Sequence, residues 1–374
     1  MKLDTVIIGG GLAGLTAGIS LQKAGKKTAI ISAGQNALHF FSGSFESMQE
    51  APERAIDLFE EAGIRLHYRE GVRLMPMGTF RPAVLSLEDV SIFPEGQLPR
   101  RALVINFTGY HDFFSSFIAE GLEKAGASCR IRFIRIDEME HLRLSPSEMR
   151  SVHIARVMDK VWEKVVQEVR ILLKDEDTVI LPQVFGLKDA SVPGKIRANI
   201  PAKVVFVGTL PPSVPGVRTQ QLLRRRYELL GGTYLMGDEV LSATLDGDRV
   251  TGLTTRNLQG HPITADHFIL ATGGYFSKGL GSNPEHVWEP LFGLDVEALE
   301  DRNDWYERDF AKDQPYLRFG VKTDPELRAL KDGKPLRNLY VAGSILGATR
   351  EDMGIGGGLA LRSALAVAET IAKD

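Results

Sequence analysis

Cysteine is nearly absent from this chain of 374 residues, which contains only Cys129. One thiol cannot form a disulfide framework, a structural zinc site or an iron–sulfur cluster. The sequence therefore fits a reducing compartment, and we expect no metal site in this chain. Any iron–sulfur chemistry would have to belong to a partner protein.

Long hydrophobic runs and a strong charge of one sign are absent as well. No stretch approaches the roughly 18 to 20 apolar residues that cross a bilayer, and no basic segment with an apolar run precedes the first predicted strand. The formal net charge of -3 gives no reason to expect nucleic acid as a partner. We therefore expect neither a direct membrane span nor secretion. The length predicts a body with one or two inserted domains.

Glycine, by contrast, is abundant, with 38 residues, and one group forms a nucleotide-binding signature. Gly9, Gly11 and Gly14 give G-x-G-x-x-G between the apolar strand "TVIIGG" and the helical pattern "LAGLTAGISLQKAG", which is followed by the strand "KTAII". In such a turn the first glycine permits the tight bend, the second lets the backbone approach a phosphate, and the third allows close packing of helix on strand. The segment predicts a βαβ nucleotide site.

This signature lacks its usual acidic residue. A carboxylate at the end of the second strand hydrogen-bonds the ribose of the AMP half of a dinucleotide. The strand here ends near Ser32, and neither Asp nor Glu occurs between Thr5 and Phe45. A mononucleotide such as FMN has no AMP half and does not need that carboxylate.

Two later segments resemble the parts that complete a flavin site. Residues 239–274 predict a β-meander with a turn at Asp246–Gly247, ending in the small-residue turn "ATGG". Residues 336–372 predict a strand, glycine-rich turns and a final amphipathic helix that begins near Gly354. The amino end of that helix would favour negative charge on a reduced flavin. Together the three segments predict a flavoprotein.

The chain resembles the B-subunit family of the anaerobic glycerol-3-phosphate dehydrogenase. The resemblance extends along nearly the whole chain and is carried by "DTVIIGGGLAGLTAG", "GQNALHFFSGS", "HIARVMD", "LPQVFGL", "GTLPPSVPGVR", "GGTYLMGDEV", "EPLFGLDV", "FGVKTD" and "NLYVAGSILG". It implies an α/β, two-dinucleotide-binding, Rossmann-like flavoprotein fold with a βαβ N-terminus, a β-meander and an inserted α/β domain.

The resemblance also implies an activity and partners. It implies a flavin-dependent oxidoreductase that acts on CH–OH donors with a quinone acceptor, and it implies FMN as the flavin of this subunit. The missing carboxylate agrees with FMN, and we keep FAD as the alternative. An FAD-containing dehydrogenase subunit would oxidise glycerol 3-phosphate to dihydroxyacetone phosphate. An iron–sulfur subunit would anchor the complex at the cytoplasmic side of the inner membrane, where this chain would be peripheral and pass electrons from the first partner toward the second. A self-contained FAD-dependent or fumarate-reductase-like oxidoreductase is the alternative, and a structural subunit that has lost its flavin is a third.

Candidate cofactor contacts come from all three glycine-rich regions and from the loop after the second strand. They are Gly9, Gly11, Gly14, Ser32, His39, Ser42, Gly43, Ser44, Thr272, Gly273, Gly343, Ser344, Gly356, Gly357 and Gly358. His39 and Arg218 are weak catalytic candidates. For Arg218 we weigh a phosphate contact against a surface residue in the first turn of a helix. Asp112 is interpreted as the N-cap of the helix that begins with "FFSS".

The predicted flavin-binding domain is discontinuous and comprises residues 1–45, 217–275 and 330–374. Residues 46–216 form the inserted α/β domain, with strands "ALVINF", "CRIRFI", "TVILP" and "KVVFVG" and a long helix over 152–173. Residues 276–329 form a second, irregular insertion. Within it we expect Trp305, Tyr306, Asp309 and Phe310 to pack, with a cap over the flavin as the alternative.

Overall fold

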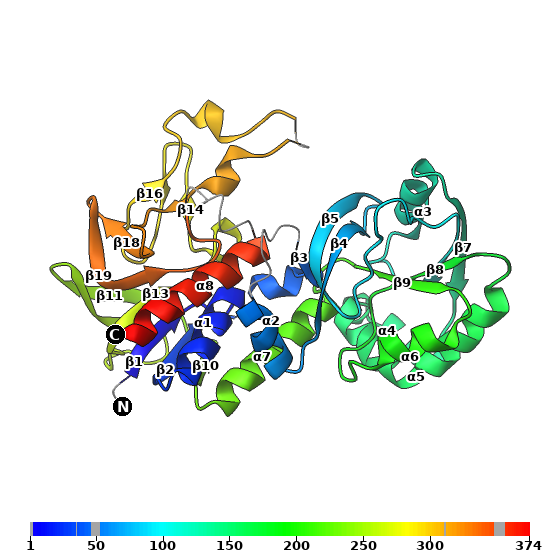
Figure 1. Ribbon diagram of the computed structural model, residues 1–374, viewed down its shortest axis with the longest axis horizontal. Coiled ribbons are helices and arrows are strands. Elements are labelled where there is room, and N and C mark those ends of the chain that lie inside the picture. Colours follow the sequence, from blue (N-terminus) through cyan, green and yellow to red (C-terminus); the bar gives the residue numbers. More distant parts are fainter. Residues whose placement is uncertain (1–2, 35, 46–52, 310–311, 348–355) are drawn as a thin grey trace. The chain divides into compact units, whose positions relative to one another are not determined.

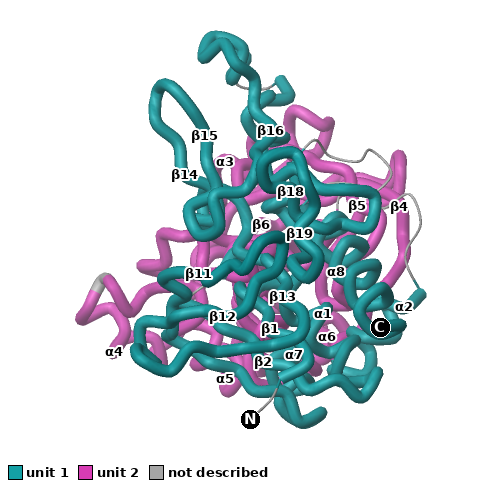
Figure 2. Tube along the Cα trace, turned by 90° about the vertical axis from the view of Figure 1, so that its left-hand side faces the viewer, with its two compact units in different colours: residues 1–37, 48–63, 222–374 teal, residues 38–47, 64–221 magenta. Residues whose placement is uncertain are grey.

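The computed structural model describes residues 3–34, 36–45, 53–309, 312–347 and 356–374, and the chain forms two compact units (Figures 1 and 2). Unit 1 comprises residues 1–37, 48–63 and 222–374, and unit 2 comprises residues 38–47 and 64–221. The functional division predicted from the sequence, with boundaries at 46, 217, 276 and 330, stays a prediction.

Unit 1 is built on a six-stranded sheet in the order β10-β2-β1-β13-β19-β18. All neighbours are parallel except β18 and β19. The βαβ prediction is confirmed by β1 (Leu3–Ile8), α1 (Leu12–Lys23) and β2 (Thr28–Ser32). The other strands are β10 (Thr233–Met236), β13 (Ala265–Leu270), β18 (Arg328–Lys331) and β19 (Lys334–Val341). The final helix α8 (Gly356–Lys373) packs against α1 (Figure 1).

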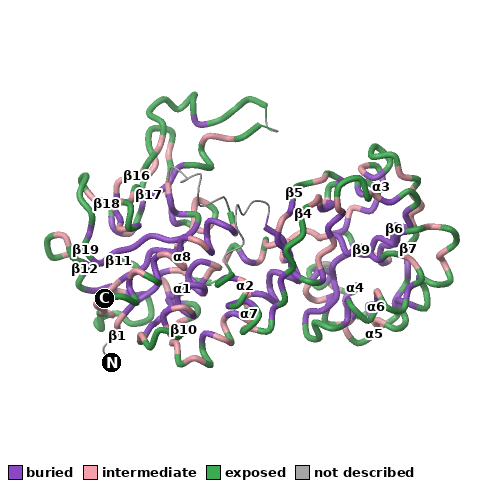
Figure 3. Tube along the Cα trace, viewed as in Figure 1, coloured by how far each residue is buried: buried purple, intermediate pink, exposed green. Residues whose placement is uncertain are grey.

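The central strands β1 and β2 are buried almost throughout, because a parallel sheet is covered on both faces (Figure 3). Val6, Ile7, Ile30 and Phe268 have no exposed surface. The predicted meander is confirmed. β11 (Val240–Asp246) and β12 (Arg249–Thr255) form its hairpin, with Gly247 at φ +59°. Ile263 then pairs antiparallel with Leu253 of β12. The chain continues into β13, which pairs with β1 and β19 in the parallel sheet, where its "FIL" run is buried.

The rest of unit 1 is an excursion between β13 and β18, together with the helix α2 (Glu53–Glu61). In its described residues the excursion contains two-residue strands and short 3₁₀ turns. The strands are β14 (Gly281–Ser282), β15 (Val287–Trp288), β16 (Val296–Glu297) and β17 (Gly320–Val321), and β16 pairs with β17.

Unit 2 contains a four-stranded parallel sheet in the order β7-β6-β8-β9. The strands are β6 (Arg101–Phe107), β7 (Ser128–Ile134), β8 (Thr178–Pro182) and β9 (Lys203–Val207), all predicted from the sequence. The helices are α3 (Ser115–Lys124), α4 (Glu140–Arg143), α5 (Ser151–Leu172), α6 (Val192–Asn199) and the first part of α7 (Val214–Leu229). A second sheet, β3-β5-β4, comprises β3 (Ser44–Phe45), β4 (Leu66–Leu74) and β5 (Phe80–Leu87).

The strand order of the unit 2 sheet places its topological switch point between β6 and β8. Open parallel sheets bind ligands outside the carboxyl ends of the strands at such a point. Here Phe107 and Phe185 lie at those ends with ring centroids 6.3 Å apart, and neither is more than 1% exposed. Apolar side chains therefore fill this position.

Candidate cofactor site

The turn after β1 is fixed by close packing at its first and third glycines. Gly9 has φ +118°, and a Cβ built there would lie 2.2 Å from the carbonyl oxygen of Ala271. A Cβ at Gly14 would lie 1.9 Å from the carbonyl oxygen of Gly9. Larger residues at either position would push the start of α1 away from the sheet, so both glycines are required by the fold.

The second glycine of the signature is in a different situation. Gly11 is the N-cap of α1 with φ -80°, which any residue adopts. A Cβ built on it would meet only the Cβ of Asn36, at 3.9 Å. The first turn of α1 contains no acidic side chain, and the first N–H groups of a helix have no partner within it. The open side of Gly11 therefore suits the approach of an anion such as a phosphate.

The carboxyl ends of β1, β13 and β19 bring three predicted regions together. A Cβ built at Gly343 would lie 2.9 Å from the Cβ of Ala13, in the first turn of α1, and one at Gly273 would lie 3.5 Å from the Oγ of Ser344. The N–H of Gly343 donates to the hydroxyl of Ser363 on α8, over 2.9 Å. Gly356, Gly357 and Gly358 form the first turn of α8, as predicted, and Gly354 lies outside the described residues. The structure thus brings Gly9, Gly273 and Gly343 together along one edge of the sheet.

Two buried polar atoms in the elements that carry these turns have no hydrogen-bond partner among the described residues. One is the hydroxyl oxygen of Thr272, a predicted contact, and the other is Nη1 of Arg362 on α8. Buried polar groups are nearly always paired, so the unpaired Thr272 hydroxyl, in the turn after β13, fits a polar ligand. Arg362 was not predicted from the sequence, because it looks like one more residue of an amphipathic helix.

Side chains of the protein fill the space at the end of β2, where the usual acidic residue of the signature is missing. A Cβ built at Gly10 would lie 2.0 Å from the hydroxyl of Tyr234 and 2.7 Å from the Oγ of Ser32. The Tyr234 hydroxyl and the Asn36 amide both donate to the carbonyl oxygen of Gly10, over 3.3 and 2.9 Å. The Arg224 guanidinium lies 4.6 Å from the centre of the Tyr234 ring. Ser32 itself is only 3% exposed.

His39, Ser42, Gly43 and Ser44 belong to unit 2, and their contacts there are structural. His39 Nε2 hydrogen-bonds the side-chain oxygen of Gln220 over 2.9 Å, and its Nδ1 is buried without a partner among the described residues. The guanidinium of Arg73 donates to the Ser42 hydroxyl. Gly43 has φ +88°, which a side chain would strain. A flavin contact for these four residues stays a prediction.

Arg218 is buried rather than at the surface, so that alternative is wrong. Its Nη1 donates to the carbonyl oxygen of Gly186 and its Nη2 to the carboxylate of Asp89, both over 2.7 Å. The side chains of Arg218 and Asp89 are 10% and 9% exposed. Two of the Arg218 guanidinium N–H groups therefore donate hydrogen bonds within unit 2.

The same region explains two of the unusual sequence motifs. "LPQVFGL" begins at the end of β8, and "HIARVMD" lies in α5. The Asp159 carboxylate at the end of the second motif accepts the N–H groups of Gly186, Lys188 and Asp189, at 2.6, 2.7 and 3.4 Å. The loop after β8 is thus held by Asp159 on one side and by Arg218 on the other.

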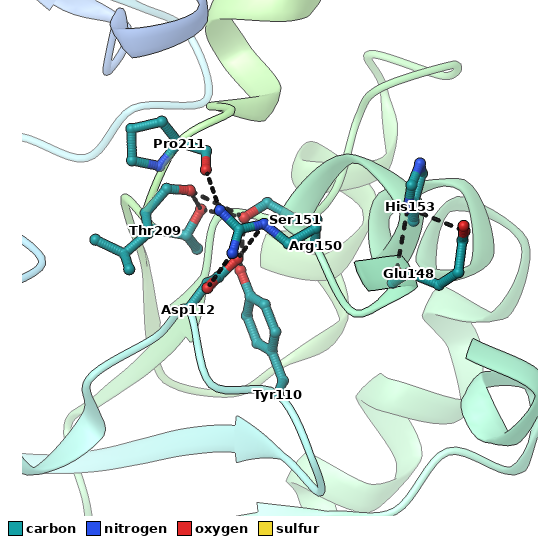
Figure 4. Close-up of polar contacts among 9 residues, drawn as sticks. Tyr110, Asp112, Glu148, Arg150, Ser151, His153, Thr209 and Pro211 are labelled. Carbon is teal, nitrogen blue, oxygen red and sulfur yellow. Dashed lines mark hydrogen bonds and ion pairs between the residues drawn. The ribbon is translucent and has the colours of Figure 1, made fainter. Parts of the chain in front are cut away.

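The loops after β6 and β9 are joined by a polar network at the start of α5 (Figure 4). Arg150 donates to the carbonyl oxygen of Pro211 over 2.9 Å, and its Nε lies 3.2 Å from the Asp112 carboxylate. The Ser151 hydroxyl hydrogen-bonds those of Tyr110 and Thr209, each over 2.7 Å. Burial raises the pKa of Asp112, against the opposite effect of Arg150. The predicted N-cap role of Asp112 is wrong: α3 begins after Phe114 and has no side-chain cap.

The described residues contain neither a cluster of metal ligands nor a helix that could span a membrane. No three or more His, Cys, Asp and Glu side chains there are grouped so that they could hold a metal ion. No helix in the same ranges combines the length and apolar character that crossing a membrane requires.

Comparison with known proteins identifies the family. The model of the FAD binding domain family matches residues 4–53 and 45–361. The B subunit of the anaerobic glycerol-3-phosphate dehydrogenase of Yersinia enterocolitica is 38% identical, over 99% of this chain and 98% of its own. The chain belongs to the B-subunit family of the anaerobic glycerol-3-phosphate dehydrogenase. The B subunit of the Pectobacterium carotovorum enzyme is 34% identical over 100% of this chain and 99% of its own. The family membership confirms the predicted flavoprotein fold and agrees with a flavin as cofactor.

Solved structures resemble this member of the B-subunit family only distantly. Glycine oxidase from Bacillus cereus covers 99% of this chain with 14% identity and a TM-score of 0.37, and 95% of that chain is matched. Glycerol-3-phosphate dehydrogenase from Bacillus halodurans, complexed with FAD, covers 73% of this chain with 12% identity and a TM-score of 0.30, and 35% of that chain is matched.

Proposed function

We propose that this chain is the flavin-containing subunit of a quinone-linked anaerobic glycerol-3-phosphate dehydrogenase. In this role it passes electrons from an FAD-containing subunit toward an iron–sulfur subunit on the cytoplasmic side of the inner membrane. The observation that carries the proposal is full-length identity of 34 to 38% with proteins named as B subunits of that enzyme, together with the intact turn at Gly9, Gly11 and Gly14.

The chain's own residues would bind and orient the flavin. The N–H groups at the start of α1 would hold its phosphate, with Gly11 leaving room for the approach. Thr272, Gly273 and Ser344 would line the turns beside it, and the first turn of α8, from Gly356, would favour negative charge. The flavin, when bound, supplies the capacity to accept and release electrons. The helix dipole contributes about 0.3–1 kcal/mol toward its reduced, anionic form.

We propose FMN as this flavin, and the burial of Ser32 supports that choice. An AMP ribose would need the end of β2 to be accessible, but Ser32 is only 3% exposed. A ribose there would also lack the hydrogen bond to a carboxylate, which contributes roughly 1.5–3 kcal/mol. FAD remains the alternative, because the matching family model describes an FAD binding domain. Mass spectrometry of the flavin released by denaturing the purified chain distinguishes the two.

An anaerobic titration tests the electron-transfer role. Glycerol 3-phosphate added to the isolated chain is expected to leave the flavin absorbance near 450 nm unchanged over minutes. Adding a catalytic amount of the FAD-containing subunit is expected to bleach it. Rapid bleaching of the isolated chain by glycerol 3-phosphate alone would refute the proposal and favour a self-contained dehydrogenase. Arg218 does not support that alternative, since Asp89 and Gly186 already use its N–H groups.

A further inference from the structure

One part of unit 1 displays apolar side chains to solvent on a structured support. It is the segment 297–318 between β16 and β17, called the arm below, of which residues 297–309 and 312–318 are described. Figure 1 shows it extending away from the six-stranded sheet, and Figure 3 shows that nearly all of its described residues are exposed.

The arm has an internal anchor, so its exposed residues are not simply unfolded. The Trp305 ring packs edge-on against Phe319 with centroids 5.5 Å apart, and the two are 3% and 6% exposed. The Trp305 indole N–H donates to the carbonyl oxygen of Leu299 over 2.6 Å, and the Arg302 guanidinium lies 4.4 Å from the Trp305 ring. The predicted packing within the insertion is therefore confirmed for Trp305. It is wrong for Tyr306 and Asp309, which are exposed, and Phe310 lies outside the described residues.

Around this anchor, four large apolar side chains face solvent. Leu317 is 68% exposed, Tyr306 49%, Leu299 44% and Tyr316 37%. Single exposed apolar residues are ordinary, but several within one short, ordered segment indicate an interaction site. Aromatic residues are also enriched in the cores of protein interfaces.

The arm is acidic as well. Residues 297–318 contain seven carboxylates and four basic side chains, a formal charge of -3, which equals that of the whole chain. Interfaces pair opposite potentials, and such pairing speeds association. The arm therefore fits a surface that presents an apolar patch surrounded by Lys and Arg.

The base of the arm is tied to the predicted cofactor turns. Val296 and Glu297 of β16 pair with Val321 and Gly320 of β17. The N–H of Val321 donates to the carbonyl oxygen of Ile345 over 2.8 Å, and the N–H of Gly347 donates back to Val321 over 3.0 Å. Ile345 directly follows Ser344, a predicted flavin contact. A protein bound to the arm would thus be attached to the same turns that would hold the flavin.

We infer that the arm is the docking surface for a partner subunit that exchanges electrons with this chain and presents a basic, apolar patch. The inference rests on the proposed function, because it assumes a multi-subunit enzyme. It adds which segment makes the contact and what chemistry the partner's surface has.

Co-expression of the affinity-tagged chain with the FAD-containing and iron–sulfur subunits tests this. The variant Leu317→Asp is compared with Leu144→Asp, a matched change at an 89% exposed position in unit 2. We expect Leu317→Asp to recover at least ten-fold less partner subunit than wild type, with unchanged flavin content and unfolding temperature. Leu144→Asp is expected to match wild type.

Charge provides a second readout that does not depend on a substitution in the apolar patch. Recovery by wild type should fall as NaCl in the wash rises from about 0.05 to 0.5 M, because salt screens exposed charges. Glu300→Lys with Glu307→Lys should lower recovery further. Equal recovery by wild type, Leu317→Asp and the charge-reversed variant would overturn the arm inference alone. Failure of the wild-type chain to retain any partner subunit would overturn the proposed function together with it.

Discussion

Gly11→Ala should separate the stability of the fold from its capacity to bind flavin. Gly11 has φ -80° and ψ -166°, and the nearest atom to an added Cβ is 3.9 Å away. An alanine that fits the native backbone stabilises a protein by about 0.4–1 kcal/mol, because it restricts the unfolded chain. At an N-cap glycine is preferred over alanine, which offsets that gain, so the free energy of unfolding should change by less than about 1 kcal/mol. The same methyl group would occupy the space through which a phosphate reaches the first turn of α1. Losing one hydrogen bond to that phosphate costs about 1.5–3 kcal/mol, or roughly 10- to 150-fold in Kd.

The assay has two parts, measured on the same preparations. Urea unfolding of flavin-free protein gives the free energy of unfolding, and quenching of flavin fluorescence on titration gives the Kd. Gly194→Ala in α6 is the control, because it adds a methyl group with no atom within 4 Å. The control should keep the wild-type Kd. Wild-type affinity in Gly11→Ala would refute the phosphate approach at this turn, and a large loss of stability in Gly11→Ala would refute the geometry.

Three further outcomes follow from buried or loop-holding groups. Arg218→Met should lower the free energy of unfolding by about 3–5 kcal/mol because it leaves the buried Asp89 carboxylate unpaired. In urea titrations, adding Asp89→Leu to this variant should restore part of that loss. No restoration would show that the loss of this ion pair is not the cause. Asp159→Ala should lower the free energy of unfolding by roughly 1.5–3 kcal/mol and speed proteolysis at residues 186–189. Unchanged cleavage would contradict the role of Asp159 in holding that loop. Burial, with a smaller effect of nearby Glu123, raises the pKa of Cys129 to about 11. Its alkylation rate should therefore still be rising above pH 10, while in the urea-unfolded chain the rate levels off near pH 9. Because the folded state keeps its thiol proton longer, Cys129 should lower the free energy of unfolding as pH rises from about 9 to 11; a folded-state rate that levels off near pH 9 would exclude this.

The sequence predicted the elements whose pattern is local. The βαβ unit, the Asp246–Gly247 hairpin, the four strands of the unit 2 sheet and its long helix all follow from apolar runs and turn residues, and the structure contains each of them. Gly9 and Gly14 were predicted for the same reason, since a positive φ or a close approach requires glycine at each of them.

What the sequence could not predict depends on pairs far apart in the chain. Nothing near Ser32 indicates that the distant Tyr234 lies beside it, or that Asp89 pairs with Arg218. Asp112 has the local pattern of an N-cap, but its carboxylate forms an ion pair with Arg150 instead. Strand β4 was missed because four consecutive residues, His67 to Glu70, are exposed and charged or polar, which hides its pairing with β5.

The packing of the first helix against the last has a consequence for how the protein is made. Helix α1 lies near the start of the sequence, and its partner α8 follows every other described element. During synthesis all of unit 2 and the rest of unit 1 are therefore translated before α8 leaves the ribosome, and until then α1 keeps an uncovered apolar face. If the flavin is held as proposed, between the turns of these two helices, it can be inserted only after α8 has docked. Loss of a few turns of α8 would then leave a protein that keeps its glycine signature and does not retain the proposed cofactor.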